Sequence, residues 1–124
     1  LRYEGPVQYN VRYTLKETQV SGGTIPAGKP VFLIGAAANR DPEAFTDADT
    51  FDIGRDQTEA QHLGLGYGIH SCLGAALARL EVLAIVNAVL DRYPVIELSD
   101  EQAERQTASL LTHGFVHLPL QLRR

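Results

Sequence analysis

Apolar and polar residues partly alternate over residues 7–15, the periodicity of a β-strand whose two faces differ. In this pattern Arg12 takes a polar position and points away from the apolar face. Residues 21–23 read Ser-Gly-Gly and predict a tight turn between two short strands, because glycine adopts positive φ without strain. The apolar run 31–34 predicts a buried strand, and residues 35–40 predict one or two helical turns.

Hydrophobic periodicity disappears over residues 41–61, which we call the acidic segment. A segment of about 20 residues without regular structure is uncommon inside a compact domain and is more often functional than not. We therefore expect an irregular segment with a role of its own. Its carboxylates are Asp41, Glu43, Asp47, Asp49, Asp52, Asp56 and Glu59.

Residues 73–90 predict one long helix, in which the only polar side chains are Arg79, Glu81 and Asn87. A helix that is apolar on nearly every side must be buried. Its length is close to the ~20 residues of a membrane span, but two charges near its middle and the lack of interfacial aromatic residues favour a core helix. Pro94 ends the helix.

The C-terminal part predicts short strands. Residues 95–98 form one strand, residues 99–106 a polar link, and residues 109–122 a strand pair around His113 and Gly114. The whole pattern predicts an α+β fold with short antiparallel strands, one long buried helix and an irregular acidic segment. In the last strand, four apolar side chains share one face: Val116, Leu118, Leu120 and Leu122.

Composition supports a globular protein of one domain. The chain has 124 residues, of which 44% are apolar and 21% charged. The net charge of −4 gives no electrostatic footprint for a phosphate backbone and argues against nucleic acid as a partner. One cysteine cannot form an internal disulfide, and residues 1–6 contain no apolar signal core. We expect a water-soluble, cytoplasmic protein.

The chain contains no methionine, so we expect it to begin partway through a longer protein. Residues 1–4 are then the end of a helix that arrives from upstream. Pro6 would terminate that helix.

The most informative stretch is residues 64–74, which read Gly-Leu-Gly-Tyr-Gly-Ile-His-Ser-Cys-Leu-Gly; we call residues 65–74 the cysteine loop. The loop places Cys72 at the start of the long helix. Unpaired N–H groups and the helix dipole stabilise a thiolate at that position. The glycines allow a flat, bulky group and backbone N–H groups to approach the sulfur.

Several kinds of site compete for this loop. A dinucleotide or phosphate loop fails, because the third glycine of G-x-G-x-x-G falls on Ser71 and no lysine follows. A zinc site could use His62, His70 and Cys72, although no second cysteine supports it. A Cys-His nucleophile pair and a buried structural cysteine are further alternatives. The remaining alternative is a haem thiolate, in which Cys72 is the axial iron ligand.

The cysteine loop resembles the haem-binding signature of cytochrome P450 monooxygenases, F-G-x-G-x-H/R-x-C-x-G. It departs at Leu65, where the family usually has Phe. The resemblance implies haem b (iron protoporphyrin IX) with Cys72 as the metal ligand and Leu65, Gly66, His70, Leu73 and Gly74 around the haem. The matching positions are Gly66, Gly68, His70, Cys72 and Gly74.

The resemblance extends beyond the loop. Residues 38–42, Phe45 and residues 49–55 are similar to the family's meander, the irregular segment before the cysteine loop. The resemblance implies that Arg55 joins a structural ion-pair network with Arg2, the last residue of an E-x-x-R motif whose glutamate lies upstream. It also implies that Arg12 and His70 pair with the haem propionates, a role suited to the bidentate guanidinium.

The resemblance implies that residues 1–124 are the C-terminal haem-binding portion of a mainly helical P450 fold, with meander, cysteine loop, long helix and terminal strand pair. The function expected is that of an oxygen-activating monooxygenase on a small lipophilic substrate, with a ferredoxin or flavoprotein as electron donor. The distal helix would lie upstream, so this chain alone is not expected to be active. The alternative is a noncatalytic fragment or interaction module that self-associates without haem.

Overall fold

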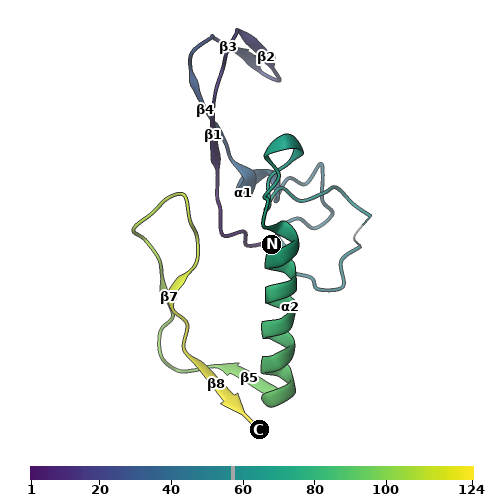
Figure 1. Ribbon diagram of the computed structural model, residues 1–124, viewed down its shortest axis with the longest axis vertical. Coiled ribbons are helices and arrows are strands. Elements are labelled where there is room, and N and C mark those ends of the chain that lie inside the picture. Colours follow the sequence, from purple (N-terminus) through teal and green to yellow (C-terminus); the bar gives the residue numbers. More distant parts are fainter. Residues whose placement is uncertain (57) are drawn as a thin grey trace. The chain divides into compact units, whose positions relative to one another are not determined.

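The computed structural model describes residues 1–56 and 58–124 (Figure 1). Gln57, which falls inside the predicted acidic segment, lies outside the described residues. The chain divides into two units, which are described separately. The first contains Leu1–Gly64 with Leu110–His113, and the second contains Leu65–Ser109 with Gly114–Arg124.

Two antiparallel strand pairs build the first unit: the sequence predicts the hairpin around the glycines and both strands of the other pair, but not that those two strands pair with each other. Strand β1 (Asn10–Tyr13) pairs with β4 (Pro30–Leu33), with Arg12 opposite Val31. Strands β2 (Thr18–Val20) and β3 (Gly23–Ile25) form a hairpin, whose turn contains Gly22 at φ 88°. Helix α1 (Gly35–Ala38) follows β4 and confirms the predicted helical turn.

Two local predictions for this unit are wrong. The run 31–34 is a strand at its start but is not buried, since Phe32, Leu33 and Ile34 are about half exposed. A two-stranded ribbon covers neither of its faces by itself. Residues 1–6 are not helical: Pro6 accepts a hydrogen bond from the His113 N–H, and Val7 forms an isolated bridge with Thr112.

The acidic segment is irregular, as predicted, and its described residues form no helix or strand. The buried residues of the described chain nevertheless lie in or beside it: Asn39, Phe45 and Ala48 are 2%, 4% and 6% exposed. Irregular backbone near a core needs partners for its polar groups. Here arginine side chains supply many of them, so the segment has a defined path.

Arg40 connects the N-terminal residues to the acidic segment. Its Nε and Nη2 donate to the Tyr3 carbonyl at 3.2 and 2.9 Å, and its Nη1 donates to Asp49 at 3.0 Å. The guanidinium carbon also lies 3.8 Å from the centroid of the Tyr3 ring, which is cation–π geometry. One side chain thus replaces the backbone pairing that a regular structure would provide.

The second unit contains the long helix α2 (Ala75–Arg92), which begins after the cysteine loop and is capped by Tyr93 directly before Pro94. Its presence confirms the predicted helix, but its predicted burial is wrong. No residue of α2 is buried, and Leu80, Leu83 and Ile85 are 68%, 63% and 63% exposed. An apolar helix is buried only where other elements cover it on several sides, and the described chain does not cover this one. Within the described residues, no helix is long and apolar enough to cross a membrane.

The predicted strand pair over residues 109–122 is also wrong in its pairing. Strand β7 (Phe115–His117) pairs with β6 (Glu104–Arg105), which lies inside the predicted polar link. Strand β8 (Leu120–Arg123) pairs instead with β5 (Val95–Leu98). Pro119 interrupts the run and its carbonyl accepts from the Ser99 N–H, so the two halves join different partners. The α+β class is confirmed.

We expect Arg40→Ala to destabilise the first unit by roughly 1–3 kcal/mol. The partly buried Tyr3 carbonyl loses two charge-assisted hydrogen bonds, and the Tyr3 ring loses its cation–π partner. Asp49→Ala removes only the exposed partner and is the matched control, with an expected cost of about 0.5 kcal/mol or less. Urea unfolding measures both. Equal losses in the two variants would contradict the role given to the Tyr3 carbonyl.

Candidate functional site

The cysteine loop is closed by its own backbone. The Cys72 N–H donates to the Leu65 carbonyl at 2.8 Å, and the Ser71 N–H donates to the Gly68 carbonyl at 3.0 Å. Between these bonds runs the 3-10 helix η1 (Gly68–His70). Gly66 and Gly68 have φ of 75° and 64°, the left-handed region that favours glycine. The two glycines allow the chain to turn back so that its ends meet.

Cys72 is exposed, which makes the interpretation as a buried structural cysteine wrong. The thiol lies two residues before Gly74, the N-cap of α2, rather than on the helix itself, and the Cys72 carbonyl accepts from the Ala75 N–H at 3.1 Å. Apolar side chains surround it in the sequence and are strongly exposed: Tyr67 is 70%, Ile69 97% and Leu73 103% exposed. A free thiol beside open apolar surface can accept a flat, apolar ligand with a metal at its centre.

The two predicted propionate partners lie in different units. Arg12 is exposed on β1, where its Nη1 donates to the Val11 carbonyl at 2.9 Å. His70 is exposed at the end of η1, in the second unit. Their pairing on one ligand stays a prediction.

The zinc alternative has no cluster to support it. Over residues 1–56 and 58–124, no group of three or more His, Cys, Asp or Glu side chains is arranged to hold a metal ion. His62 uses its Nδ1 to accept a hydrogen bond from the Gly64 N–H at 3.2 Å. His62 therefore holds the backbone of Gly64, the residue directly before the cysteine loop.

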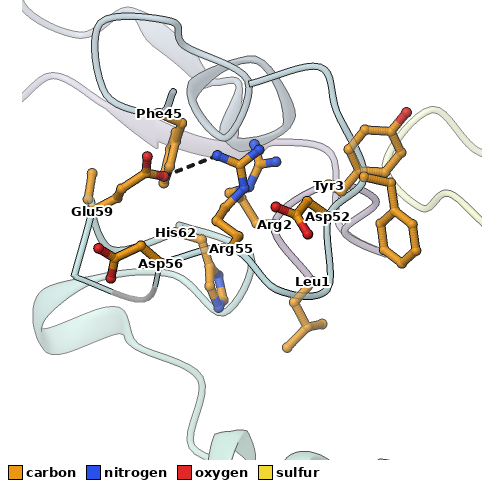
Figure 2. A pocket seen from close by; sticks show the side chains of 11 residues that line it. Leu1, Arg2, Tyr3, Phe45, Asp52, Arg55, Asp56, Glu59 and His62 are labelled. Atoms are coloured by element: carbon orange, nitrogen blue, oxygen red, sulfur yellow. Dashed lines mark hydrogen bonds and ion pairs between the residues drawn. The ribbon is translucent and has the colours of Figure 1, made fainter. Parts of the chain in front are cut away.

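Arg2 and Arg55 lie together in the first unit, beside a cavity of about 320 Å³ (Figure 2). Arg2 donates to the carbonyls of Asn39 at 2.7 Å, Ala48 at 2.9 Å and Thr50 at 3.3 Å. We call Arg2 and Arg55, with the carbonyls that they bind, the arginine clamp. The Arg55 guanidinium donates to the carbonyls of Thr46, Asp47 and Thr50.

The contacts of the arginine clamp shift the pKa values of Arg2 and Glu59. Partial burial, and then repulsion by Arg55 and Arg40, lowers the pKa of the Arg2 guanidinium. Arg55 has a carboxylate partner, since its Nη1 lies 3.1 Å from Glu59. Hydrogen bonding with Thr46, assisted by Arg55, lowers the pKa of Glu59. The clamp therefore joins two guanidinium groups of like charge with Glu59 as the carboxylate in direct contact with Arg55.

Sequence reasoning assigned no role to Asn39, Arg40 or Glu59, although all three hold the acidic segment. Asn39 and Arg40 lie in residues 38–42, which resemble the family's meander. Their partners, Leu63 and Tyr3, are distant in sequence and could not be identified from it. The spacing of Arg55 and Glu59, four residues apart, was the available signal. It is usually interpreted only on helices, and this pair lies on irregular backbone.

Comparison with known proteins identifies the family of the chain. The sequence model of the family Cytochrome P450 matches residues 1–122. Biotin biosynthesis cytochrome P450 of Bacillus subtilis (strain 168) is 45% identical over 100 residues, which are 81% of this chain and 25% of that protein. Cytochrome P450 monooxygenase PikC of Streptomyces venezuelae is 42% identical over 126 residues, covering 100% of this chain and 30% of that protein.

A solved structure gives the same answer for the fold. The crystal structure of CYP109E1 from Bacillus megaterium in complex with testosterone superposes with a TM-score of 0.93 at 33% identity, covering 100% of this chain and 34% of that one. The chain thus spans about a quarter to a third of the length of the relatives that it matches. Family model, sequence identity and fold agree, and the chain belongs to the cytochrome P450 family.

Proposed function

We propose that residues 1–124 are the C-terminal haem-binding portion of a P450 monooxygenase and that the Cys72 thiolate is the axial ligand of haem b. The observation that carries the proposal is the exposed thiol on a loop closed by the bond from the Cys72 N–H to the Leu65 carbonyl. A ligand must reach the sulfur, and this backbone bond fixes the residue that bears it.

The residues of the loop fit this cofactor. Porphyrin has two broad apolar faces, and the exposed side chains of Ile69 and Leu73 flank the cysteine in the sequence. Leu65, Gly66 and Gly74 complete the surroundings of the haem in the proposal. Leu65 replaces the usual Phe and still provides apolar surface. A thiolate is also a ligand suited to iron.

Polar residues hold the edge of the cofactor in this proposal. Arg12 and His70 pair with the haem propionates, because both side chains are exposed and carry N–H groups that can donate to a carboxylate. Arg2 and Arg55 form the structural ion-pair network that gives the acidic segment its path. Two observations support this assignment: both guanidinium groups donate to backbone carbonyls of the acidic segment, and Arg55 pairs with Glu59 at 3.1 Å.

When bound, the haem supplies oxygen activation for insertion into a small lipophilic substrate, with electrons from a ferredoxin or flavoprotein. The residues of this chain then have three tasks. The thiolate donates electron density to the iron, the loop holds the sulfur, and the arginines hold the segment that leads to the loop. The similarity to a P450 solved with testosterone supports a lipophilic substrate.

A second candidate function is supported by α2. Several apolar side chains of this helix are more than half exposed, among them Leu77, Leu80 and Ile85. Apolar surface of this extent favours association. In this candidate the chain of 124 residues is a noncatalytic interaction module that pairs with another copy and carries no haem.

For the leading function we expect Cys72→Ser, in the protein expressed from its complete reading frame, to abolish the red-shifted absorbance of the reduced, carbon-monoxide-bound form. A hydroxyl oxygen donates far less electron density to iron than a thiolate does. The matched control is Ser71→Ala, which changes the neighbouring side chain and keeps the sulfur. A wild-type protein that never shows this absorbance would refute the haem-thiolate assignment.

We expect Gly66→Ala to reduce haem retention far more than Gly68→Ala. Both positions have positive φ, which costs an L-residue roughly 1–2 kcal/mol. A Cβ on Gly66 would also lie 3.0 Å from the His70 carbonyl oxygen, whereas a Cβ on Gly68 would meet open space among the described residues. The ratio of haem absorbance to protein in each purified variant measures the difference. Equal retention would show that the close approach inside the loop is unimportant.

For the second function we expect the 124-residue chain to sediment as a colourless dimer or larger oligomer, with Leu80→Lys weakening the association. Analytical ultracentrifugation with a haem absorbance trace makes the measurement. A coloured species that carries haem supports the leading function instead. Lys is introduced at an exposed position of α2, so the cysteine loop stays unchanged.

A further inference from the structure

Asn39 stands out because it is a polar residue that is almost fully buried. Its exposed fraction is 2%, and among residues 1–56 and 58–124 no other polar residue is buried to this extent. A buried polar side chain costs free energy unless it forms hydrogen bonds. Its partner therefore indicates what the residue does.

The partner is the backbone directly ahead of the cysteine loop. Asn39 Oδ1 accepts a hydrogen bond from the Leu63 N–H at 2.6 Å, across 24 positions of sequence. The backbone of Asn39 is fixed as well. Its N–H donates to the Gly35 carbonyl at 2.9 Å, and its carbonyl accepts from Arg2 at 2.7 Å. The backbone that carries the side chain is thus held by helix α1 on one side and by Arg2 on the other.

Gly64, the next residue, is held closely in the same unit. Its N–H donates to His62 Nδ1 at 3.2 Å, and a Cβ built on it would lie 3.0 Å from the Leu1 carbonyl oxygen. The residue after Gly64 is Leu65, whose carbonyl closes the cysteine loop by accepting from the Cys72 N–H. The bonded path from Asn39 to the cysteine therefore runs through three consecutive residues, 63–65.

We propose that Asn39 is a positioning residue for the haem thiolate: its buried Oδ1 fixes the backbone from which the cysteine loop starts. The inference rests on the proposed function, because a start point matters to the sulfur only if the sulfur binds iron. Loss of the acceptor leaves the Leu63 N–H without its buried partner. The equilibrium between the observed backbone path of residues 63–65 and other paths then shifts toward the others by roughly five- to a hundredfold. The start of the loop then samples other paths, and the sulfur is displaced more easily from its position.

The test uses the haem-loaded protein expressed from its complete reading frame. In Asn39→Leu, the ratio of the red-shifted band to the unshifted band of the reduced, carbon-monoxide-bound form is expected to fall about fivefold or more. Asn39→Asp is expected to keep the ratio within about twofold, because a carboxylate oxygen still accepts from Leu63 and Arg2 offsets its charge. Asn39→Ser, whose hydroxyl is too short to reach Leu63, carries the same expectation as Asn39→Leu if the bulkier variant does not fold.

Thr14→Val is the matched control for a purely structural effect. It removes the hydrogen bond from the Thr14 hydroxyl to the Pro26 carbonyl at 2.6 Å, in the turn between β3 and β4 of the same unit. It is expected to lower the unfolding temperature and leave the band ratio unchanged. Unchanged ratios in Asn39→Leu and Asn39→Ser, or the same fall in Thr14→Val, would overturn the role of Asn39. A wild-type protein without the red-shifted band would instead overturn the proposed function itself.

Discussion

The described structure depends on arginine side chains that donate to backbone carbonyls. The described residues of the acidic segment form no ladder of regular hydrogen bonds, so their carbonyls need other donors. Arg2 and Arg55 supply them across residues 39–50, and Arg40 does the same for Tyr3. Guanidinium groups suit this task because each offers five donors in a fixed plane. The few buried residues of the chain gather around this clamp.

The clamp also shows how an irregular segment can hold a defined path ahead of Cys72. A helix or strand would impose a fixed repeat on residues 41–64, whereas a segment fixed by side chains can follow any path that its donors support. In this chain that path ends at Leu63 and Gly64, both bonded before the cysteine loop begins. The loop itself needs only one backbone bond and two glycines to present its thiol.

The parts predicted from the sequence are those with local causes. Helix α2, helix α1 and the hairpin at Gly22 follow from helix propensity and turn chemistry within a few residues. The pairing of β6 with β7, and of β5 with β8, could not be predicted, because a short strand does not encode its distant partner. Burial of α2 was predicted wrongly for a similar reason, since burial depends on what covers a helix. The acceptors of Arg2 and Arg55 could not be predicted, because every residue has a backbone carbonyl and the sequence does not show which of them accept. The haem contacts of Arg12, His70 and Cys72 stay proposals.

The Thr50 carbonyl accepts from both Arg2 and Arg55, at 3.3 Å in each case. The carbonyl oxygen has two lone pairs and accepts both bonds, but the two guanidinium groups repel each other, so removing either one relieves that repulsion. The energetic effects of the two arginines are therefore not additive, and a double-mutant cycle would contain a coupling energy that neither single change reveals. Sequence change at one of these positions is then constrained by the residue present at the other.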